Sequence, residues 1–177
     1  MNGIALREPE PSDAAQITKI DAEGLATGHA SFRDTPCDWA AFKAGYLTGR
    51  ALSRVAVHDE TVVAWAAVSP TSTRAVYAGV GEVSVYVGTD WRGRGAGRAL
   101  LSGVIDASES AGYWTLVAQI FPENMGSLAL HQALGFEQVG IRRALGRMGY
   151  GPMADRWRDV VMLERRSDVV GREIADW

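Results

Sequence analysis

The sequence is short of several residue types, and each shortage excludes a class of protein. Cys37 is the one cysteine among 177 residues, so no internal disulfide can form, and with no second thiol or histidine cluster near it we expect no metal site. No apolar run approaches the roughly eighteen residues of a membrane span, and the first residues lack the charged-then-apolar pattern of a signal peptide. We therefore expect a cytoplasmic protein with no membrane partner.

Lysine is rare as well, and the net charge is negative. Lys19 and Lys43 are the only lysines among 18 basic residues, and 21 acidic residues leave a net charge of −3. Such arginine usage, in a background rich in Ala, Gly and Val, is typical of a high-GC bacterial genome. The arginines between 142 and 166 alternate with Asp155, Asp159 and Glu164. This segment therefore predicts a solvated face or a dimer contact, and no nucleic-acid partner is expected.

Length and patterning indicate one domain of mixed secondary structure. The chain is 47% hydrophobic, enough for one sizeable core, and no linker divides it. The central apolar run at 114–120 is expected to be a strand buried on both faces, and glycines at 79 and 81 are expected to mark a bulge or a close backbone approach. The fold class is therefore α/β (α+β) around a central, mostly antiparallel sheet. Helices are predicted over 14–24, 39–47, 95–110 and 126–134, and strands over 4–7, 53–58, 62–68, 76–87, 114–120, 136–141 and 157–163.

A glycine-rich turn between a strand and a helix is the most informative local pattern. The strand Val85-Tyr86-Val87 leads through Arg92-Gly93-Arg94-Gly95-Ala96-Gly97 into an amphipathic helix. Glycines let the backbone approach an anion, and the unpaired N–H groups at a helix start point at it. No Walker-type lysine follows, and no acidic residue stands where a Rossmann turn needs one. The turn predicts a phosphate site, although glycines in a tight strand-to-helix connection can also serve geometry alone.

Two motifs carry a resemblance to a known family. The pattern R-x-x-G-x-G at Arg92–Gly97, after a V-Y-V strand, resembles the coenzyme A pyrophosphate loop of the GNAT superfamily of N-acetyltransferases. The segment Asn124–Phe136 resembles the superfamily's N-x-x-S-x-x-x-[aromatic or His]-x-x-x-G-F helix, in the same order and spacing. Three further stretches, Ala30–Arg33, Glu82–Val87 and Trp157–Val160, are similar to those of phosphinothricin and methionine sulfone or sulfoximine acetyltransferases. The resemblance covers roughly residues 4 to 166.

The resemblance implies a fold, an activity and an assembly. It implies the GNAT fold over 1–166, with six to seven strands and about four helices, and a tail over 167–177 whose order the sequence does not fix. It implies direct transfer from acetyl-CoA to the α-amine of a small amino-acid-like substrate such as phosphinothricin, methionine sulfone or methionine sulfoximine, by a homodimer. Acetylation of a protein N-terminus or a polyamine is an alternative, as is a non-catalytic acetyl-CoA-binding module.

The resemblance also assigns roles to individual residues. Glu82 matches a general base for the attacking amine, and His131 stands where many of these enzymes carry a tyrosine that protonates the departing thiolate. Without the resemblance, Glu82 is an exposed strand carboxylate, His131 a core or rim residue and Asn124 a helix cap. The residues expected to bind acetyl-CoA are Val85, Tyr86, Val87, Arg92, Gly93, Arg94, Gly95, Ala96, Gly97, Asn124 and Ser127. Those expected to bind the substrate are Phe32, Arg33, Arg74 and Tyr77, which are otherwise ordinary surface residues.

Overall fold

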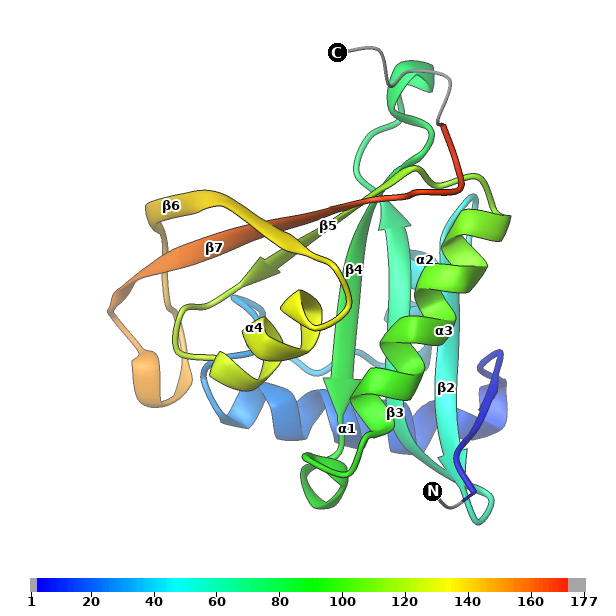
Figure 1. Cartoon of the computed structure of the whole chain (residues 1–177). Helices are drawn as coiled ribbons and strands as arrows, with labels where there is room; N and C mark the ends of the chain where they lie inside the picture. The colour runs from blue at the N-terminus through cyan, green and yellow to red at the C-terminus, as the bar shows by residue number, and fades with distance from the viewer. Residues whose placement is uncertain (1–2, 172–177) are drawn as a thin grey trace.

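A seven-stranded sheet with the strand order β1-β2-β3-β4-β5-β7-β6 forms the centre of the molecule. A computed structural model describes residues 3–171 and is drawn in Figure 1. The strands are β1 (Ala5–Arg7), β2 (Leu52–His58), β3 (Thr61–Pro70), β4 (Val80–Val87), β5 (Thr115–Ile120), β6 (Glu137–Arg147) and β7 (Trp157–Arg166). The α-helices are α1 (Ala14–Ala26), α2 (Trp39–Tyr46), α3 (Ala96–Ser110) and α4 (Met125–Gln132), and short 3-10 turns include η2 (Ala75–Tyr77).

The one parallel pairing in the described sheet, between β4 and β5, is short, and the two strands separate beyond it. It joins three residue pairs, from Val80 with Thr115 to Glu82 with Val117, and then stops. Beyond Glu82 the two strands diverge, and Figure 1 shows β5 turning away from β4 toward β7. Within residues 3–171, the main-chain groups on this edge of β4 therefore have no strand partner, as expected for a sheet that splays around a ligand.

Helices cover both faces of the sheet. Helix α3 packs on β2, β3 and β4, while α1 and α2 pack on the opposite face of β3. The α2 face is built around Phe42 and Trp65, both fully buried and with ring centroids 5.2 Å apart. Truncating either to alanine would cost about 3–5 kcal/mol. No helix within residues 3–171 is long and apolar enough to cross a membrane.

Three expectations about the strands are wrong. The predicted strand over 76–87 begins only at Val80, because residues 75–77 form the turn η2. The carbonyl of Gly79 accepts hydrogen bonds from the N–H groups of Trp114 (2.8 Å) and Thr115 (3.1 Å), and the Trp114 ring fills the space that a side chain at Gly79 would need. Strand β5 is buried on one face only, with Gln119 exposed on the other, because that face borders a cleft. Strand β6 is longer than predicted and extends to Arg147.

The chain after β7 is held against the end of α3 as far as the structure describes it. The hydroxyl of Ser167 donates to Glu109 Oε1 at the end of α3 (2.8 Å) and accepts the N–H groups of Val169 and Val170 (3.0 Å each). The structure therefore describes residues 167–171 of the predicted tail. Residues 172–177 of that tail lie outside the described residues. The domain boundary at 166 stays a prediction.

Candidate active site

Two clefts meet where β4 and β5 separate. The larger has a volume of about 730 Å³ and lies between the turn before α3, the start of α4 and the end of β4. The smaller, of about 300 Å³, is lined by the loop after α1 and by the side of β4 and β5 that carries Glu82 and Gln119. Five residues line both clefts: Ala30, Val85, Tyr86, Asn124 and Ser127. A long ligand in the larger cleft can therefore present its end to the smaller one.

The turn before α3 has the backbone that an anion site needs. Gly93 and Gly95 have φ angles of +72° and +88°, which L side chains rarely adopt. The N–H of Ala99 donates to the carbonyl of Gly95 (3.0 Å) as the first helical hydrogen bond of α3. The N–H groups of Ala96, Gly97 and Arg98 precede it and have no partner within the helix. A helix start of this kind, beside the larger cleft, is suited to binding an anion.

Gly97 serves packing, not backbone conformation. A Cβ atom at this position would lie 3.2 Å from Val87 Cγ2 and 3.3 Å from Leu130 Cδ2. Both distances are tighter than ordinary van der Waals contact. The missing side chain lets the start of α3 pack closely against β4 and α4 beside the larger cleft.

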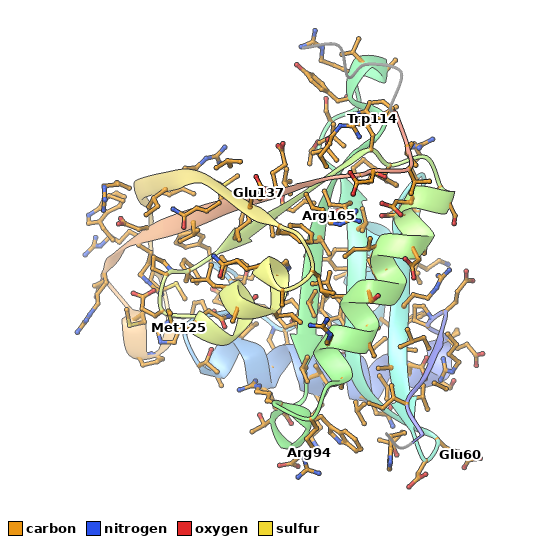
Figure 2. The ribbon with its side chains drawn as sticks, viewed as in Figure 1. Glu60, Arg94, Trp114, Met125, Glu137 and Arg165 are labelled. Carbon is orange, nitrogen blue, oxygen red and sulfur yellow. The ribbon has the colours of Figure 1, made fainter. Side chains whose placement is uncertain are left out.

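The arginines of the turn point in different directions. Arg92 donates from Nε to the carbonyl of Val87 (3.2 Å) and lines the larger cleft. Arg94 instead lies over the Trp91 ring, 5.7 Å from its centroid, outside the cleft lining, and Figure 2 shows it at the outer tip of the turn. The Ala96 side chain is fully buried, so this residue offers the cleft only its N–H. Arg98 lines the larger cleft but is not among the predicted site residues. Its position in the first turn of α3, directly after the glycine turn, could have indicated a role at the phosphate site.

Glu82 lies in the smaller cleft beside Gln119, which is not among the predicted site residues. Its side chain is half-buried, and Oε2 accepts a hydrogen bond from Nε2 of Gln119 (3.0 Å). The two side chains come from neighbouring strands at the point where strand pairing ends. No pattern around Gln119 indicates this contact, because it depends on the register of β4 and β5.

His131 also lines the smaller cleft, but its ring is 2% exposed. Nδ1 lies 2.8 Å from the carbonyl oxygen of Ser127, and because a carbonyl only accepts, Nδ1 carries the proton. Among the residues that the structure describes, Nε2 is buried without a partner, and the ring packs edge-on against Phe136. Burial lowers the pKa of His131 below its ordinary value, although the Ser127 carbonyl opposes this. The neutral ring thus has an acceptor at Nε2, not a proton to give.

Asn124 both caps helix α4 and holds the loop after α1. Its Oδ1 accepts the N–H of Ser127 (3.2 Å) at the start of α4, and its Nδ2 donates to the carbonyl of His29 (3.1 Å). The capping interpretation of Asn124 is therefore right. Because both Asn124 and Ser127 line the two clefts, capping does not remove them from the site.

Of the four residues expected to bind the substrate, two line the smaller cleft. Phe32 and Arg33 lie on the loop after α1 and border it. Arg74 and Tyr77 line neither cleft, and the Arg74 guanidinium lies over the Tyr77 ring, 5.5 Å from its centroid. They belong to the connection before β4, which Figure 1 shows at the opposite end of the sheet from the turn before α3. In the single chain, Arg74 and Tyr77 therefore lie away from both clefts, and their expected role in substrate binding stays a prediction.

A buried arginine on β7 holds two cleft-lining loops, and it too was missed. Arg158 is 2% exposed, and its guanidinium donates to the carbonyl of Gly28 (2.8 Å), to Nδ1 of His29 (3.0 Å) and to Oε2 of Glu123 (3.1 Å). It also lies 4.0 Å from the centroid of the Phe121 ring. One side chain thereby ties the loop after α1 and the loop before α4 to the sheet.

These features together define a class of enzyme. A helix start that binds anions, an unpaired strand edge and an adjoining cleft with a carboxylate suit an acyltransferase that takes its acyl group from coenzyme A. The chain belongs to the acetyltransferase (GNAT) family, whose model matches residues 18–136. It is an acetyl-CoA-dependent N-acetyltransferase, which confirms the fold, the enzyme class and the co-substrate expected from the sequence.

Several characterised proteins are similar along most of the chain. Phosphinothricin N-acetyltransferase from Alcaligenes faecalis is 32% identical over 164 residues, covering 90% of this chain and 81% of that protein. An L-methionine sulfoximine/L-methionine sulfone acetyltransferase from Pseudomonas aeruginosa is 29% identical over 93% of this chain and 95% of its own length. The crystal structure of a phosphinothricin acetyltransferase from Sinorhizobium meliloti in complex with acetyl-CoA matches with a TM-score of 0.84 at 30% identity, covering 99% of this chain and 93% of that one.

Proposed function

We propose that this enzyme acetylates the α-amine of a small, polar, amino-acid-like substrate of the phosphinothricin or methionine sulfone and sulfoximine type. The observation that carries the proposal is the smaller cleft of about 300 Å³, which opens from the unpaired edge of β4 and contains Glu82. A cleft of this size suits a small molecule better than a peptide. The names of the relatives from Alcaligenes faecalis and Pseudomonas aeruginosa support the same substrate class.

The residues of the larger cleft fit acetyl-CoA. The N–H groups of Ala96, Gly97 and Arg98 would hold the pyrophosphate, with Arg92 and Arg98 adding positive charge. The edge of β4 from Val85 to Val87 would pair with the pantetheine amides, and Asn124 and Ser127 lie opposite it. When bound, acetyl-CoA supplies the thioester carbonyl that the amine attacks.

Glu82 would act as the general base for the amine. Its carboxylate accepts one proton from the substrate ammonium, the amine nitrogen bonds to the acetyl carbon, and the carbon–sulfur bond breaks as coenzyme A leaves as a thiolate. The nitrogen releases its second proton to a water molecule, which passes a proton on to the thiolate. A positioned general base contributes about 10²- to 10⁴-fold in rate. Because Nδ1–H of His131 is bound to the Ser127 carbonyl, we propose that water protonates the thiolate. A role for His131 itself stays a prediction.

Arg33 is the candidate for holding the substrate carboxylate. Nη2 contacts both oxygens of Asp21 (2.8 and 3.1 Å), and Nη1 donates to the carbonyl of Thr35 (2.9 Å). A guanidinium has five N–H groups, so donors remain for a ligand. Tyr46 and Tyr86 line the same cleft. Burial raises the pKa of Tyr86 to about 12, so its phenol stays a neutral donor.

A panel of amines tests the proposal. Thiol release from acetyl-CoA is measured with phosphinothricin, methionine sulfone, methionine sulfoximine, spermidine and a peptide with a free N-terminus. We expect turnover with the first three and little with the others. Preference for spermidine or the peptide would overturn the substrate class. Tight acetyl-CoA binding with no thiol release for any of these amines would likewise overturn the proposed substrate class.

We also propose a homodimer and no nucleic-acid partner. Large apolar side chains on the edge strand β6 and the start of β7 are exposed, which is unusual for a monomer surface. They are Val139, Ile141, Leu145 and Trp157. Arg143 pairs with Asp159 (3.1 Å) and Arg147 with Asp155 (3.0 Å), so acidic groups balance the arginines of this region. Light scattering after size exclusion tests the assembly, and the cytoplasmic location stays a prediction for cell fractionation.

A further inference from the structure

Gln119 faces Glu82 across the opening between β4 and β5. Pairing of the two strands ends at Glu82 with Val117, and because alternate residues of a strand share a face, Gln119 is the next side chain of β5 on that face. Leu116, Ala118 and Ile120 are buried on the other side. Nε2 of Gln119 donates to Oε2 of Glu82 over 3.0 Å, and both side chains line the smaller cleft. A side-chain bridge thus continues the link between the strands where the main-chain ladder stops.

We propose that Gln119 is a positioning residue for Glu82; this rests on the proposed function, in which Glu82 accepts the amine proton. The amide occupies Oε2 and leaves Oε1 as the acceptor for the substrate ammonium. It also restricts the rotation of a half-buried glutamate, whose side chain would otherwise have several rotamers to choose from. The residue acts on the amine through Glu82 and does not itself exchange a proton.

The other polar groups around Glu82 are engaged elsewhere or make no hydrogen bond to it. Arg33 is paired with Asp21, and the remaining titratable side chains of the smaller cleft are Tyr46, Tyr86 and His131. On β7, Glu164 lies opposite Val117 in the register. Within residues 3–171, Gln119 is the side chain that donates a hydrogen bond to the Glu82 carboxylate. The position of that carboxylate therefore depends on one amide.

Two substitutions of the full-length enzyme test the inference. Gln119→Leu removes the donor at similar volume, and Gln119→Glu replaces it with a second carboxylate. We expect kcat/KM for methionine sulfone, or for the best amine of the panel, to fall about 5- to 20-fold in the first and about 10- to 100-fold in the second. The acidic limb of the pH–rate profile of Gln119→Glu should move to higher pH, because two neighbouring carboxylates disfavour the charged state. Acetyl-CoA affinity should not change.

A matched control makes the same charge change on an exposed residue. Gln138→Glu lies on β6, outside the linings of both clefts, and should leave both the rate and the pH profile unchanged. Gln119 is exposed, so its variants should melt within a few degrees of wild type. A purely structural role would lower the amount of folded enzyme without moving the acidic limb.

A double-mutant cycle separates this inference from the proposed function. In the Glu82→Gln background, Gln119→Leu should change kcat/KM less than twofold, because no carboxylate remains to be positioned. Near-wild-type turnover of Glu82→Gln alone would overturn the base assignment and this inference with it. Two other outcomes would overturn only the inference about Gln119. In the first, Glu82→Gln is slow but the Gln119 variants stay within twofold of wild type at every pH. In the second, Gln119→Leu keeps its full effect on kcat/KM in the double variant.

Discussion

Arg33 and Asp21 form an ion pair in which the acid is wholly buried and the base borders the smaller cleft. Nη2 of Arg33 lies 2.8 Å from Asp21 Oδ1, the Asp21 side chain has no exposed surface, and the Arg33 side chain is 38% exposed. Asp21 Oδ2 also accepts the N–H of Cys37 (2.7 Å). The guanidinium thus fixes the loop after α1 to helix α1 and also borders the smaller cleft. Under the proposed function, substrate binding and stability are therefore coupled at this residue.

That coupling predicts the behaviour of Arg33→Ala. Removing the guanidinium leaves a buried carboxylate without its charged partner, so we expect the free energy of unfolding to fall by about 1–3 kcal/mol. The KM for the amine should rise about tenfold or more, because a charge-assisted hydrogen bond is lost as well. Urea denaturation and steady-state kinetics measure the two effects. The double variant Arg33→Leu/Asp21→Leu should recover part of the stability, since the Cys37 N–H also loses its acceptor, without recovering KM. Equal recovery of both would contradict a direct contact with substrate.

The glycine turn yields a prediction with a matched control. Gly95→Ala meets no atom within 4 Å but forces an alanine to a φ of +88°, whereas Gly151→Ala imposes a similar strain at +66°, also in open space and away from both clefts. Each should cost about 1–2 kcal/mol of stability. Only Gly95→Ala should weaken acetyl-CoA binding, by about tenfold, equivalent to 1.4 kcal/mol. Calorimetric titration distinguishes them, and equal affinities in the two variants would remove the turn from the pyrophosphate site.

His131 predicts how stability depends on pH. Because burial lowers its folded-state pKa, the unfolded chain binds a proton more readily than the folded one. This contribution is fully present above the unfolded pKa of about 6.5 and is lost as the pH falls below that value. Between pH 7.5 and 5.5, His131→Gln should therefore lose less stability than wild type does. Guanidinium denaturation at several pH values measures the difference, and parallel pH curves for the two proteins would show that His131 is not buried in its neutral form.

Local chemistry was predictable from the sequence, and long-range register was not. The glycines at 93 and 95 and the capping Asn124 act within a few residues, so their types indicate the turn and the helix start directly. The contact between Gln119 and Glu82 spans 37 positions and that between Arg158 and Gly28 spans 130, and each depends on how strands align. Val76 and Tyr77 are good strand formers, but the Trp114 ring packed on Gly79 ends the ladder before them, so tertiary packing overrides their propensity.

Arg158 supplies the last prediction, because it supports the site without lining it. Arg158→Met keeps an unbranched apolar side chain against the Phe121 ring but removes the donors to Gly28, His29 and Glu123. We expect the free energy of unfolding to fall by about 2–4 kcal/mol, since the Gly28 carbonyl loses its partner and the network breaks.

The loop after α1 also carries Phe32 and Arg33 into the smaller cleft, so the KM for the amine should rise in Arg158→Met even in fully folded samples at low temperature. Arg158→Lys should restore little of this loss, because an ammonium cannot reach three partners with the geometry of a guanidinium. The control is Arg156→Met, an exposed arginine two positions earlier on the chain. Denaturation curves and amine KM values that coincide for Arg158→Met and Arg156→Met would show that the buried guanidinium does not hold the loop.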